Sequence, residues 1–277
     1  MLSQVKSLLR QHKLGTRKEL GQHFLVDEQY MDSIVAAAAL TSADIVVEVG
    51  AGLGMLTKKL AEQAGKVVAV EIDSGFVSVL RRNLSSFSNV DILCGDILEV
   101  DLSRFVPDST AQSYKVVGNL PYCIASPVLR HFLELSSKPS LMVVMVQREV
   151  GEAIVAAHGR SSILSTSVQF YSKPTVVTYV PARSFYPPPR VDSVVLRLEV
   201  YRELPIQVAD ISSFFHVVRS GFSSPRKQLR NSLARSLGMS THNVVLLLEK
   251  SGIEPGRRAE TLTLQEWRNL WSVLYSG

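Results

Sequence analysis

Short apolar runs alternate with helix-like patterns through the middle of the chain. An unbroken apolar run between turn residues indicates a buried strand, and apolar residues at three- and four-residue spacing indicate a helix. The predicted strands are 45–49, 66–71, 90–94, 114–119, 140–147, 175–179 and 193–200, and the predicted helices between them are 52–63, 73–84 and 151–157. Strands that alternate with helices are typical of a parallel sheet covered by helices. The pattern therefore predicts an α/β fold.

The pattern changes near residue 205, where strand signals end and helical patterns take over. Pro225, Gly238 and Gly252 interrupt these patterns, because proline and glycine break helices. A chain of 277 residues has room for two domains, at roughly 100–200 residues each. We predict an α/β domain with an N-terminal arm at 1–204 and a small all-α domain at 205–277.

One segment of the α/β domain, residues 180–190, fits neither a strand nor a helix. It contains Pro181 and the run Pro187-Pro188-Pro189. Proline fixes φ and has no N–H to donate, so it is excluded from central strands and helix interiors. We expect this segment to be a stiff, extended loop.

Composition excludes several classes of protein. With 46% hydrophobic and 20% charged residues, the chain has the composition of a folded soluble protein. Its longest apolar runs, 34–40 and 141–146, are far shorter than the ~20 residues of a membrane span, and its N-terminus has no signal-peptide pattern. Only Cys94 and Cys123 are present, too few for a disulfide scaffold or a zinc cluster. We expect a cytoplasmic protein without a membrane partner or a metal ion, in which both cysteines are small buried apolar residues.

The net charge of +5 is unevenly distributed. Residues 1–26 carry +4, residues 27–204 carry −3 and residues 205–277 carry +4. Basic ends on a slightly acidic middle favour contact between the ends and a polyanion, although basic tails also occur by chance. We expect the N-terminal charges to lie on a mobile arm that becomes ordered on RNA or cofactor binding. These residues are Lys6, Arg10, Lys13, Arg17 and Lys18.

The C-terminal region contains a basic cluster. Arg226, Lys227, Arg230 and Arg235 are spaced so that several should share one face of a helix. Such a face is either simply solvated or in contact with the phosphates of a nucleic acid. The basic C-terminal charge favours the second interpretation, so Arg226, Lys227 and Arg230 are the predicted RNA contacts.

A glycine-rich turn joins the first predicted strand to the first predicted helix. Its sequence is Gly50-Ala51-Gly52-Leu53-Gly54, and glycines in such a turn allow the backbone to approach a ligand closely. A dinucleotide-binding turn would have a glycine or alanine where this chain has Met55. The turn therefore predicts a cofactor site but argues against NAD or FAD.

Two acids follow the next two predicted strands. Glu71 ends the second strand and Asp96 follows the third. A carboxylate at the first position can accept two hydrogen bonds from a ribose diol, and one at the second can accept from an adenine amino group. With the glycine turn, these acids favour an adenosine-containing ligand without a phosphate, and S-adenosylmethionine fits better than NAD. The alternative is that Glu71 and Asp96 only cap helices.

The fourth strand ends at Asn119-Leu120-Pro121-Tyr122, at the edge of the sheet where α/β proteins bind ligands. The N6 amino group of adenine is a poor nucleophile, because its lone pair is delocalised into the ring. The Asn119 side-chain oxygen and the Leu120 carbonyl can accept its hydrogens, and Tyr122 can stack on a base splayed out of RNA. The nitrogen becomes acidic as it gains a methyl group, so catalysis would depend on positioning rather than on a strong base. The alternative is an ordinary Asn-x-Pro turn.

Together these motifs resemble those of the small-subunit ribosomal RNA adenine dimethyltransferases, which methylate two adjacent adenosines near the 3′ end of that RNA. The resemblance extends over nearly the whole chain and keeps the motifs in order. They are 20–25 (LGQHFL), 48–54 (EVGAGLG), 119–122 (NLPY), 147–150 (QREV), 185–193 (FYPPPRVDS) and 226–231 (RKQLRN).

The resemblance implies a Rossmann-like S-adenosylmethionine-dependent methyltransferase sheet, followed by a small all-α domain that docks on RNA or the ribosome. It implies S-adenosylmethionine as methyl donor, the small-subunit ribosomal RNA of a pre-mature small ribosomal subunit as substrate, and a role in late subunit assembly. We expect the protein to act as a monomer. The residues implied to contact the cofactor are His23, Leu25, Gly50, Gly52, Glu71, Asp96 and Asn119. The implied catalytic residues are Asn119, Leu120, Tyr122 and Phe185, with the base held between the rings of Tyr122 and Phe185.

Three alternatives stay open. A large-subunit adenine methyltransferase of the antibiotic-resistance type has a similar glycine turn and a similar Asn-x-Pro-Tyr motif, but the motifs at 185–193 and 226–231 favour the small-subunit family. A non-catalytic assembly or transcription factor on the same scaffold would not need the two acids and the Asn-Leu-Pro-Tyr turn. An oxidoreductase is disfavoured by Met55.

Overall fold

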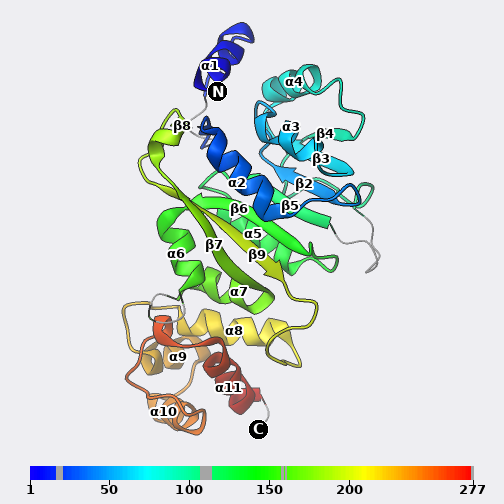
Figure 1. Ribbon diagram of the computed structural model, residues 1–277. Helices are drawn as coiled ribbons and strands as arrows, with labels where there is room; N and C mark the ends of the chain where they lie inside the picture. Colours follow the sequence, from blue (N-terminus) through cyan, green and yellow to red (C-terminus); the bar gives the residue numbers. More distant parts are fainter. Residues whose placement is uncertain (17–20, 107–113, 157–158, 160, 276–277) are drawn as a thin grey trace. The chain divides into compact units, whose positions relative to one another are not determined.

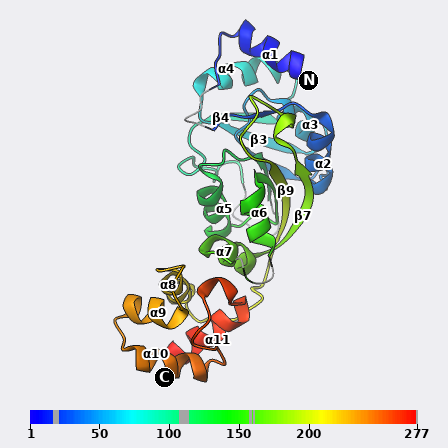
Figure 2. The same ribbon diagram turned by 90° about the vertical axis from the view of Figure 1, so that its left-hand side faces the viewer.

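The structure is a computed structural model that describes residues 1–16, 21–106, 114–156, 159 and 161–275. The chain divides into two compact units. The first, the α/β unit, comprises Met1–Gly151 and Lys173–Val200. The second, the helical unit, comprises Glu152–Ser172 and Tyr201–Gly277. Figures 1 and 2 show the elements of both units in two views.

The observed units differ from the predicted domains in the segment 152–172. The sequence pattern assigns this segment to the α/β domain, whereas in the structure it belongs to the helical unit. Helix α7 (Ile163–Tyr171) packs its aromatic side chains on helix α8 (Ile211–Gly221). The ring of Phe170 stacks on that of Phe214, with 5.1 Å between the centroids. Burial of these large rings against one another, rather than order along the chain, determines where α7 belongs.

A mixed sheet runs through the α/β unit (Figure 1). Within the described residues it has seven strands, in the order β4-β3-β2-β5-β6-β9-β7. They are β2 (Ile45–Val49), β3 (Lys66–Glu71), β4 (Val90–Cys94), β5 (Tyr114–Asn119), β6 (Leu141–Gln147), β7 (Ser172–Val180) and β9 (Ser193–Val200). Neighbours from β4 to β6 pair in parallel, and β9 pairs antiparallel with β6. The predicted Rossmann-like sheet is confirmed, with antiparallel pairing added beside β6.

The strands form where valine and isoleucine dominate, because branched side chains pack well on a pleated surface. The strands predicted at 45–49, 66–71, 90–94, 114–119 and 193–200 are confirmed to the residue. The strand predicted at 140–147 begins at Leu141, and the one predicted at 175–179 extends over Ser172–Val180. Nearly every side chain of β2, β3 and β6 is buried, as expected for parallel strands covered on both faces.

The strand register brings the carboxyl ends of the parallel strands to one edge of the sheet. Glu71, the last residue of β3, pairs with Cys94, the last residue of β4. Asn119, the last residue of β5, pairs with Met145 near the end of β6. The segments that follow these strands therefore meet at this carboxyl edge.

Helices α1 to α5 and the first residues of α6 belong to the same unit as the sheet. They are α1 (Leu2–Gln11), α2 (Glu28–Ala38), α3 (Met55–Ala61), α4 (Ser74–Asn83), α5 (Ala125–Glu134) and α6 (Arg148–Val155), of which α6 continues into the helical unit. The helix predicted at 52–63 is shorter, because Gly52 and Gly54 have φ values of 56° and 82° that a helix does not admit. The helix predicted at 151–157 begins earlier, at Arg148, and its predicted last residue, Ala157, lies outside the described residues.

Part of the arm predicted from the charge pattern is a packed helix in the structure. Helix α1 covers the first part of this region and buries Val5 and Leu9 in a cluster with Phe76 of α4. The four-residue spacing of these apolar side chains gives α1 one face that packs on the α/β unit. Arg17 and Lys18 of the predicted arm lie outside the described residues.

The proline-rich segment is anchored to the residues around β1 (Phe24–Leu25). Ala182–Ser184 form a 3-10 turn, and Phe185–Tyr186 form strand β8, which pairs antiparallel with β1. The backbone N–H of Val26 donates to the Ser184 carbonyl at 2.8 Å. The prediction of an extended loop is therefore right for β8 and wrong for the 3-10 turn, which forms where the chain turns to meet β1.

The helical unit also contains α9 (Leu229–Leu237), α10 (Thr241–Lys250) and α11 (Leu264–Tyr275). The predicted breaks at Pro225, Gly238 and Gly252 are confirmed, since all three lie between helices. The core of the unit includes Trp267, which is fully buried. Helix α8 ends against it at Gly221, where an added Cβ would lie 2.3 Å from the indole ring.

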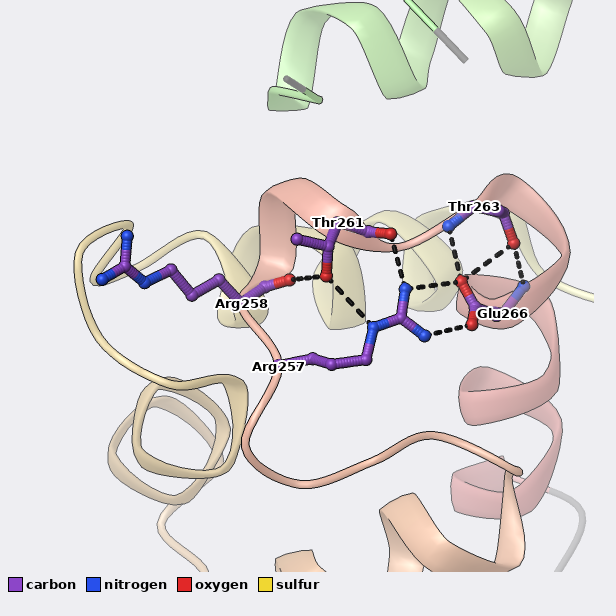
Figure 3. A network of polar contacts seen from close by, with 5 residues as sticks. All are labelled: Arg257, Arg258, Thr261, Thr263 and Glu266. Carbon is purple, nitrogen blue, oxygen red and sulfur yellow. Dashed lines mark hydrogen bonds and ion pairs between the residues drawn. The ribbon is translucent and has the colours of Figure 1, made fainter. Parts of the chain in front are cut away.

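An ion-pair network attaches the loop after α10 to the start of α11 (Figure 3). Arg257 donates to both carboxylate oxygens of Glu266 and, at 2.5 Å, to the backbone carbonyl of Thr261. Glu266 also accepts from the Thr263 N–H at 2.8 Å. Burial acts to raise the pKa of Glu266, but the hydrogen bonds from Arg257 and Thr263 outweigh it and lower the pKa overall. The network therefore fixes this loop within the helical unit by charge as well as by packing.

Candidate active site

A cavity of about 260 Å³ lies at the carboxyl edge of the sheet, within the α/β unit. Every predicted cofactor contact lines it, namely His23, Leu25, Gly50, Gly52, Glu71, Asp96 and Asn119. Of the predicted catalytic residues, Asn119, Leu120 and Tyr122 line the cavity, whereas Phe185 does not. Because ligands of open α/β sheets bind at the carboxyl ends of the strands, this cavity is the candidate active site.

The glycine turn forms one wall of the cavity in a conformation that requires glycine. Gly50 and Gly52 have φ values of 74° and 56°, in the left-handed region. A Cβ added to Gly52 would also lie 3.1 Å from the ring of Phe24. The turn therefore presents bare backbone to the cavity, as a cofactor-binding turn does.

The carboxylate of Glu71 ties this turn to the end of β3. Its oxygens accept from the backbone N–H groups of Gly52 at 2.8 Å and Asp73 at 2.9 Å. Burial raises the pKa of Glu71, and the two backbone hydrogen bonds oppose that shift only in part. The N-cap of α4 is Asp73, so Glu71 is not merely a helix cap. Its carboxylate is instead a fixed acceptor in the cavity wall.

Asp96 lies in the same wall, after β4. Its Oδ1 accepts from the Leu98 N–H at 3.0 Å, which holds the local turn. Ile72, directly after Glu71, also lines the cavity and is 51% exposed. A cavity wall with both a carboxylate and an exposed apolar side chain suits a heteroaromatic ring that carries an amino group. Ile72 was not singled out from the sequence, although an apolar residue placed immediately after a strand-terminal acid was a usable signal.

A third acid, Glu48 of β2, also lines the cavity and was not singled out from the sequence. Its side chain is 1% exposed, and its Oε2 has no hydrogen-bond partner among the described residues. Burial raises the pKa of Glu48 to about 8; a hydrogen bond with the Thr57 side chain opposes this shift, and the charge of Glu71 adds to it. The signal in the sequence is a lone acid within the valine-rich strand 45–49. A buried carboxyl oxygen without a partner is a group that a bound ligand or water could satisfy.

Asn119 is held in one orientation by the residue that precedes β1. Its Nδ2 donates to the backbone carbonyl of His23 at 2.9 Å, which uses the donor end of the amide and directs Oδ1 away from that carbonyl. The next residue, Leu120, is 1% exposed, and its N–H donates to the Met145 carbonyl at 3.2 Å. The two acceptors predicted to hold an amino group, Asn119 Oδ1 and the Leu120 carbonyl, therefore belong to a well-anchored part of the wall.

The half-buried ring of Tyr122 is fixed from two sides. Its hydroxyl lies 2.7 Å from the Oγ of Ser193, and burial raises the pKa of the Tyr122 phenol. The imidazole of His23 lies beside the ring, with 5.9 Å between centroids and 27° between planes. The Nδ1–H of His23 in turn donates to the Pro187 carbonyl at 2.7 Å. Tyr122 thus offers a positioned aromatic surface on which a flat base could stack.

Phe185 is the one predicted catalytic residue that the structure does not bring to the cavity. It is 3% exposed and packs in the core cluster that includes Met31, Met145 and Val195. Strand β8 holds its backbone against Leu25 of β1. A position in a sequence motif does not show which way a side chain points. The role of Phe185 in holding a base stays a prediction.

Both cysteines are exposed, so the prediction that they are buried is wrong. Cys94 is the last residue of β4 and Cys123 follows the Asn-Leu-Pro-Tyr turn, so both lie at the carboxyl edge, where the chain leaves the packed sheet. Among the described residues, no group of three or more His, Cys, Asp or Glu side chains could hold a metal ion. Nor does the described part of the chain contain a helix long and apolar enough to cross a membrane.

The predicted RNA contacts lie in the helical unit, but they do not share one helical face. Arg226 and Lys227 are exposed in the turn between α8 and α9, and Arg230 is half-buried in the first turn of α9. The prediction of a common face is wrong because α9 begins only at Leu229. The turn nevertheless presents two adjacent cationic side chains to solvent.

The chemistry of the cavity fits S-adenosylmethionine. Glu71 and Asp96 both line the cavity, and their carboxylates are acceptors of the kind that ribose hydroxyls and an adenine amino group need. No Lys or Arg occurs among the described residues that line the cavity.

Comparison with known proteins gives a family match over most of the chain. Residues 13–274 match the family model described as ribosomal RNA adenine dimethylase. The chain is 43% identical over 273 residues to the ribosomal RNA small subunit methyltransferase A of Dehalococcoides mccartyi, with 99% of this chain and 93% of that protein covered. It is 41% identical to the protein of the same name from Moorella thermoacetica, with 97% of this chain and 96% of that protein covered.

Two solved structures are similar over nearly their full length. One is a dimethyladenosine transferase from Plasmodium falciparum, with a TM-score of 0.75, 25% identity, and 90% of this chain and 96% of that chain covered. The other is the 23S rRNA methyltransferase ErmE, with a TM-score of 0.72, 26% identity, and 91% of this chain and 99% of that chain covered.

Proposed function

The chain belongs to the ribosomal RNA adenine dimethylase family and is an S-adenosylmethionine-dependent rRNA adenine dimethyltransferase, and from this premise we propose that its targets are two adjacent adenosines near the 3′ end of small-subunit ribosomal RNA. The observation that carries the chemistry is the orientation of Asn119. Its amide donates to the His23 carbonyl and leaves Oδ1 as an acceptor in the wall of the cavity.

Asn119 and Leu120 prepare the nucleophile. The Asn119 Oδ1 and the Leu120 carbonyl each accept one hydrogen of the N6 amino group, which draws the nitrogen lone pair out of conjugation with the ring. Bound S-adenosylmethionine supplies an electrophilic methyl group on its sulfonium. The nitrogen becomes acidic as it is methylated, so the chain needs no strong base at this point. The contribution of these residues is positioning, which can account for a large part of a rate enhancement.

Tyr122 holds the base in place. Its ring provides a stacking surface, and its bond to Ser193 fixes the tilt of that surface. An adenine inside RNA must be splayed out of its stack to reach such a pocket. For Phe185 to close on the other side of the base, its ring must leave the core cluster in which it is packed, whereas His23 already lies beside Tyr122.

The remaining walls would hold the cofactor. Gly50 and Gly52 would let the cofactor lie close to the backbone of the glycine turn. Glu71 would accept hydrogen bonds from the ribose hydroxyls of the cofactor, and Asp96 would accept one from its adenine amino group. His23, Leu25 and Asn119 would line the side of the cavity nearest the target base. These assignments are supported by the shared cavity and by the fixed hydrogen bonds of Glu71.

The relatives support the small subunit as the substrate. The Dehalococcoides mccartyi and Moorella thermoacetica proteins are both named as small-subunit methyltransferases. In the helical unit, Arg226, Lys227 and Arg230 would contact phosphates of the RNA. We place the reaction late in assembly, on a pre-mature small subunit in the cytoplasm.

Mapping the modified nucleotides tests this proposal. Ribosomal RNA from cells with and without the protein would be copied by primer extension, because dimethylated N6 blocks base pairing and stops the polymerase. The expected result is a protein-dependent stop at two adjacent adenosines near the 3′ end of small-subunit RNA. A protein-dependent stop confined to large-subunit RNA would contradict the proposed substrate and favour the activity named for ErmE.

A further inference from the structure

A second aromatic site lies outside the cavity in the α/β unit. Tyr179 is the penultimate residue of β7 and is 46% exposed. The guanidinium carbon of Arg148 lies 5.1 Å from the centroid of its ring, within the range of a cation–π contact. Neither residue lines the cavity. A single exposed tyrosine is unremarkable, so the surroundings of this pair decide whether it has a function.

Asp192 connects the pair to the predicted base-stacking residue. The backbone N–H of Arg148 donates to the Asp192 carbonyl at 3.0 Å. The next residue, Ser193, holds the hydroxyl of Tyr122 at 2.7 Å. Ser193 also pairs with Gln147, the residue before Arg148, across β9 and β6. The Arg148–Tyr179 pair is therefore only a few residues from the anchor of Tyr122, along the same edge of the sheet.

Two further arginines lie in the segment that Asp192 joins to the pair. Arg183 and Arg190 are exposed in the segment between β7 and β9. This segment is held in place by the Ala182 N–H, which donates to Asp192 Oδ1 at 3.0 Å. Exposed acids also lie in this region, namely Asp192, whose carboxylate is engaged in that bond, Glu149, and Glu28, which lines the same hollow as Arg183. An exposed aromatic ring among arginines is the combination that binds single-stranded nucleic acid, because the ring stacks on a base and the cations attract the backbone.

We propose that Tyr179 and Arg148 form a stacking platform for a nucleobase that neighbours the target adenosine in the ribosomal RNA strand. This inference rests on the proposed function and adds a second base contact to it. The guanidinium of Arg148 covers part of the Tyr179 ring, and the base stacks on the exposed part. While the target adenine lies against Tyr122, the platform holds the adjoining nucleotide and keeps the strand extended across the edge of the sheet.

The test compares Tyr179→Ala and Tyr179→Phe in methyl transfer to small ribosomal subunits that lack the modification. Loss of one stacking contact should raise the KM for the subunit about tenfold in Tyr179→Ala, with kcat and S-adenosylmethionine affinity within twofold of wild type. Tyr179→Phe keeps the ring and should match wild type. A suitable control is Tyr275→Ala, which removes a tyrosine that is 49% exposed in the helical unit and should leave the KM unchanged.

Direct binding of the same subunits, measured by filter retention, separates the platform from the proposed function. If wild type binds but transfers no methyl group while Tyr179→Ala binds about tenfold more weakly, the platform stands and the proposed function fails. If wild type is active and Tyr179→Ala keeps both KM and subunit affinity within twofold, the platform is contradicted and the proposed function stands. Absence of subunit binding by wild type would overturn both.

Discussion

The hydroxyl groups of Tyr122 and Ser193 lie 2.7 Å apart and join the turn after β5 to the first residue of β9. Ser193 is fully buried, so this bond has little competition from water. It connects two motifs that are far apart in the sequence, Asn-Leu-Pro-Tyr and the end of the proline-rich segment. The surface on which the target base would stack is therefore set by the antiparallel strand as well as by the parallel sheet.

Removal of this bond should lower the rate more than it affects cofactor binding. In Ser193→Ala the Tyr122 ring loses its anchor, and a hydrogen bond of about 0.5–1.5 kcal/mol corresponds to a roughly 2- to 12-fold lower kcat. Tyr122→Phe should have a similar effect, and the double variant should be no slower than either single one, because both remove the same bond. Additive losses in the double variant would show that the two hydroxyls act separately.

Glu71 should control cofactor affinity. Its carboxylate holds Gly52 and Asp73 through their N–H groups, so Glu71→Ala loses both the acceptors for the cofactor and the anchor of the glycine turn. We expect S-adenosylmethionine to bind about 30-fold or more weakly by calorimetry, since hydrogen bonds to a charged group contribute about 1.5–3 kcal/mol each. Glu71→Gln keeps one acceptor oxygen and should lose less. Affinity within twofold of wild type in Glu71→Ala would contradict the assigned role.

Glu48 should make stability depend on pH. Burial raises its pKa from an ordinary value of 4.5 to about 8 in the folded state. The folded protein therefore holds a proton that the unfolded chain releases above pH 4.5, and stability contributed by this group falls as the pH rises from 4.5 through 8. In Glu48→Gln this fall should be absent, so the difference in unfolding free energy between variant and wild type should grow between pH 5.5 and pH 8.5, by an amount on the order of several kcal/mol.

Urea unfolding at several pH values measures this difference. Glu62→Gln, a change at an exposed acid just after α3, is the matched control and should follow the wild-type profile. A Glu48→Gln profile parallel to wild type over the whole range would show that Glu48 does not retain a proton in the folded state.

The exposed turn before α9 should contribute to RNA affinity through charge. Arg226→Ala and Lys227→Ala should each weaken binding to small subunits without changing cofactor affinity. Each lost phosphate contact should also reduce the slope of log affinity against log salt by about 0.7–0.9. Arg130→Ala, at an exposed arginine of α5 paired with Glu134, serves as the control. An unchanged salt slope in both test variants would place the RNA elsewhere.

The sheet and the glycine turn were predictable because their signals are local. Strands 45–49 and 66–71 are dominated by valine, and Gly50 and Gly52 mark positions where only glycine tolerates positive φ without strain. The acids Glu71 and Asp96 could be assigned to one site because parallel strands end at the same edge. The positions of these two acids follow from the order of the strands and helices along the chain, without knowledge of contacts between distant segments.

The features that the sequence analysis missed depend on contacts between segments far apart in the sequence. Nothing near Phe185 shows that β8 would pair with β1 and bury its ring, and nothing near Glu48 shows that its Oε2 would be left without a partner. Cys94 was expected to be buried from its residue type alone, but exposure depends on what covers the edge of the sheet. The assignment of α7 to the helical unit likewise follows from the packing of Phe170 on Phe214.

The central claim is that Asn119 positions an adenine amino group of small-subunit RNA for methylation. Small subunits from a strain that lacks the modification would be incubated with labelled S-adenosylmethionine and wild-type protein or Asn119→Ala, and the RNA digested to nucleosides. The account predicts label in N6,N6-dimethyladenosine with wild type and little or none with Asn119→Ala, although the variant still binds the cofactor. Wild-type rates in Asn119→Ala, or tight subunit binding by wild type without any transfer, would contradict it.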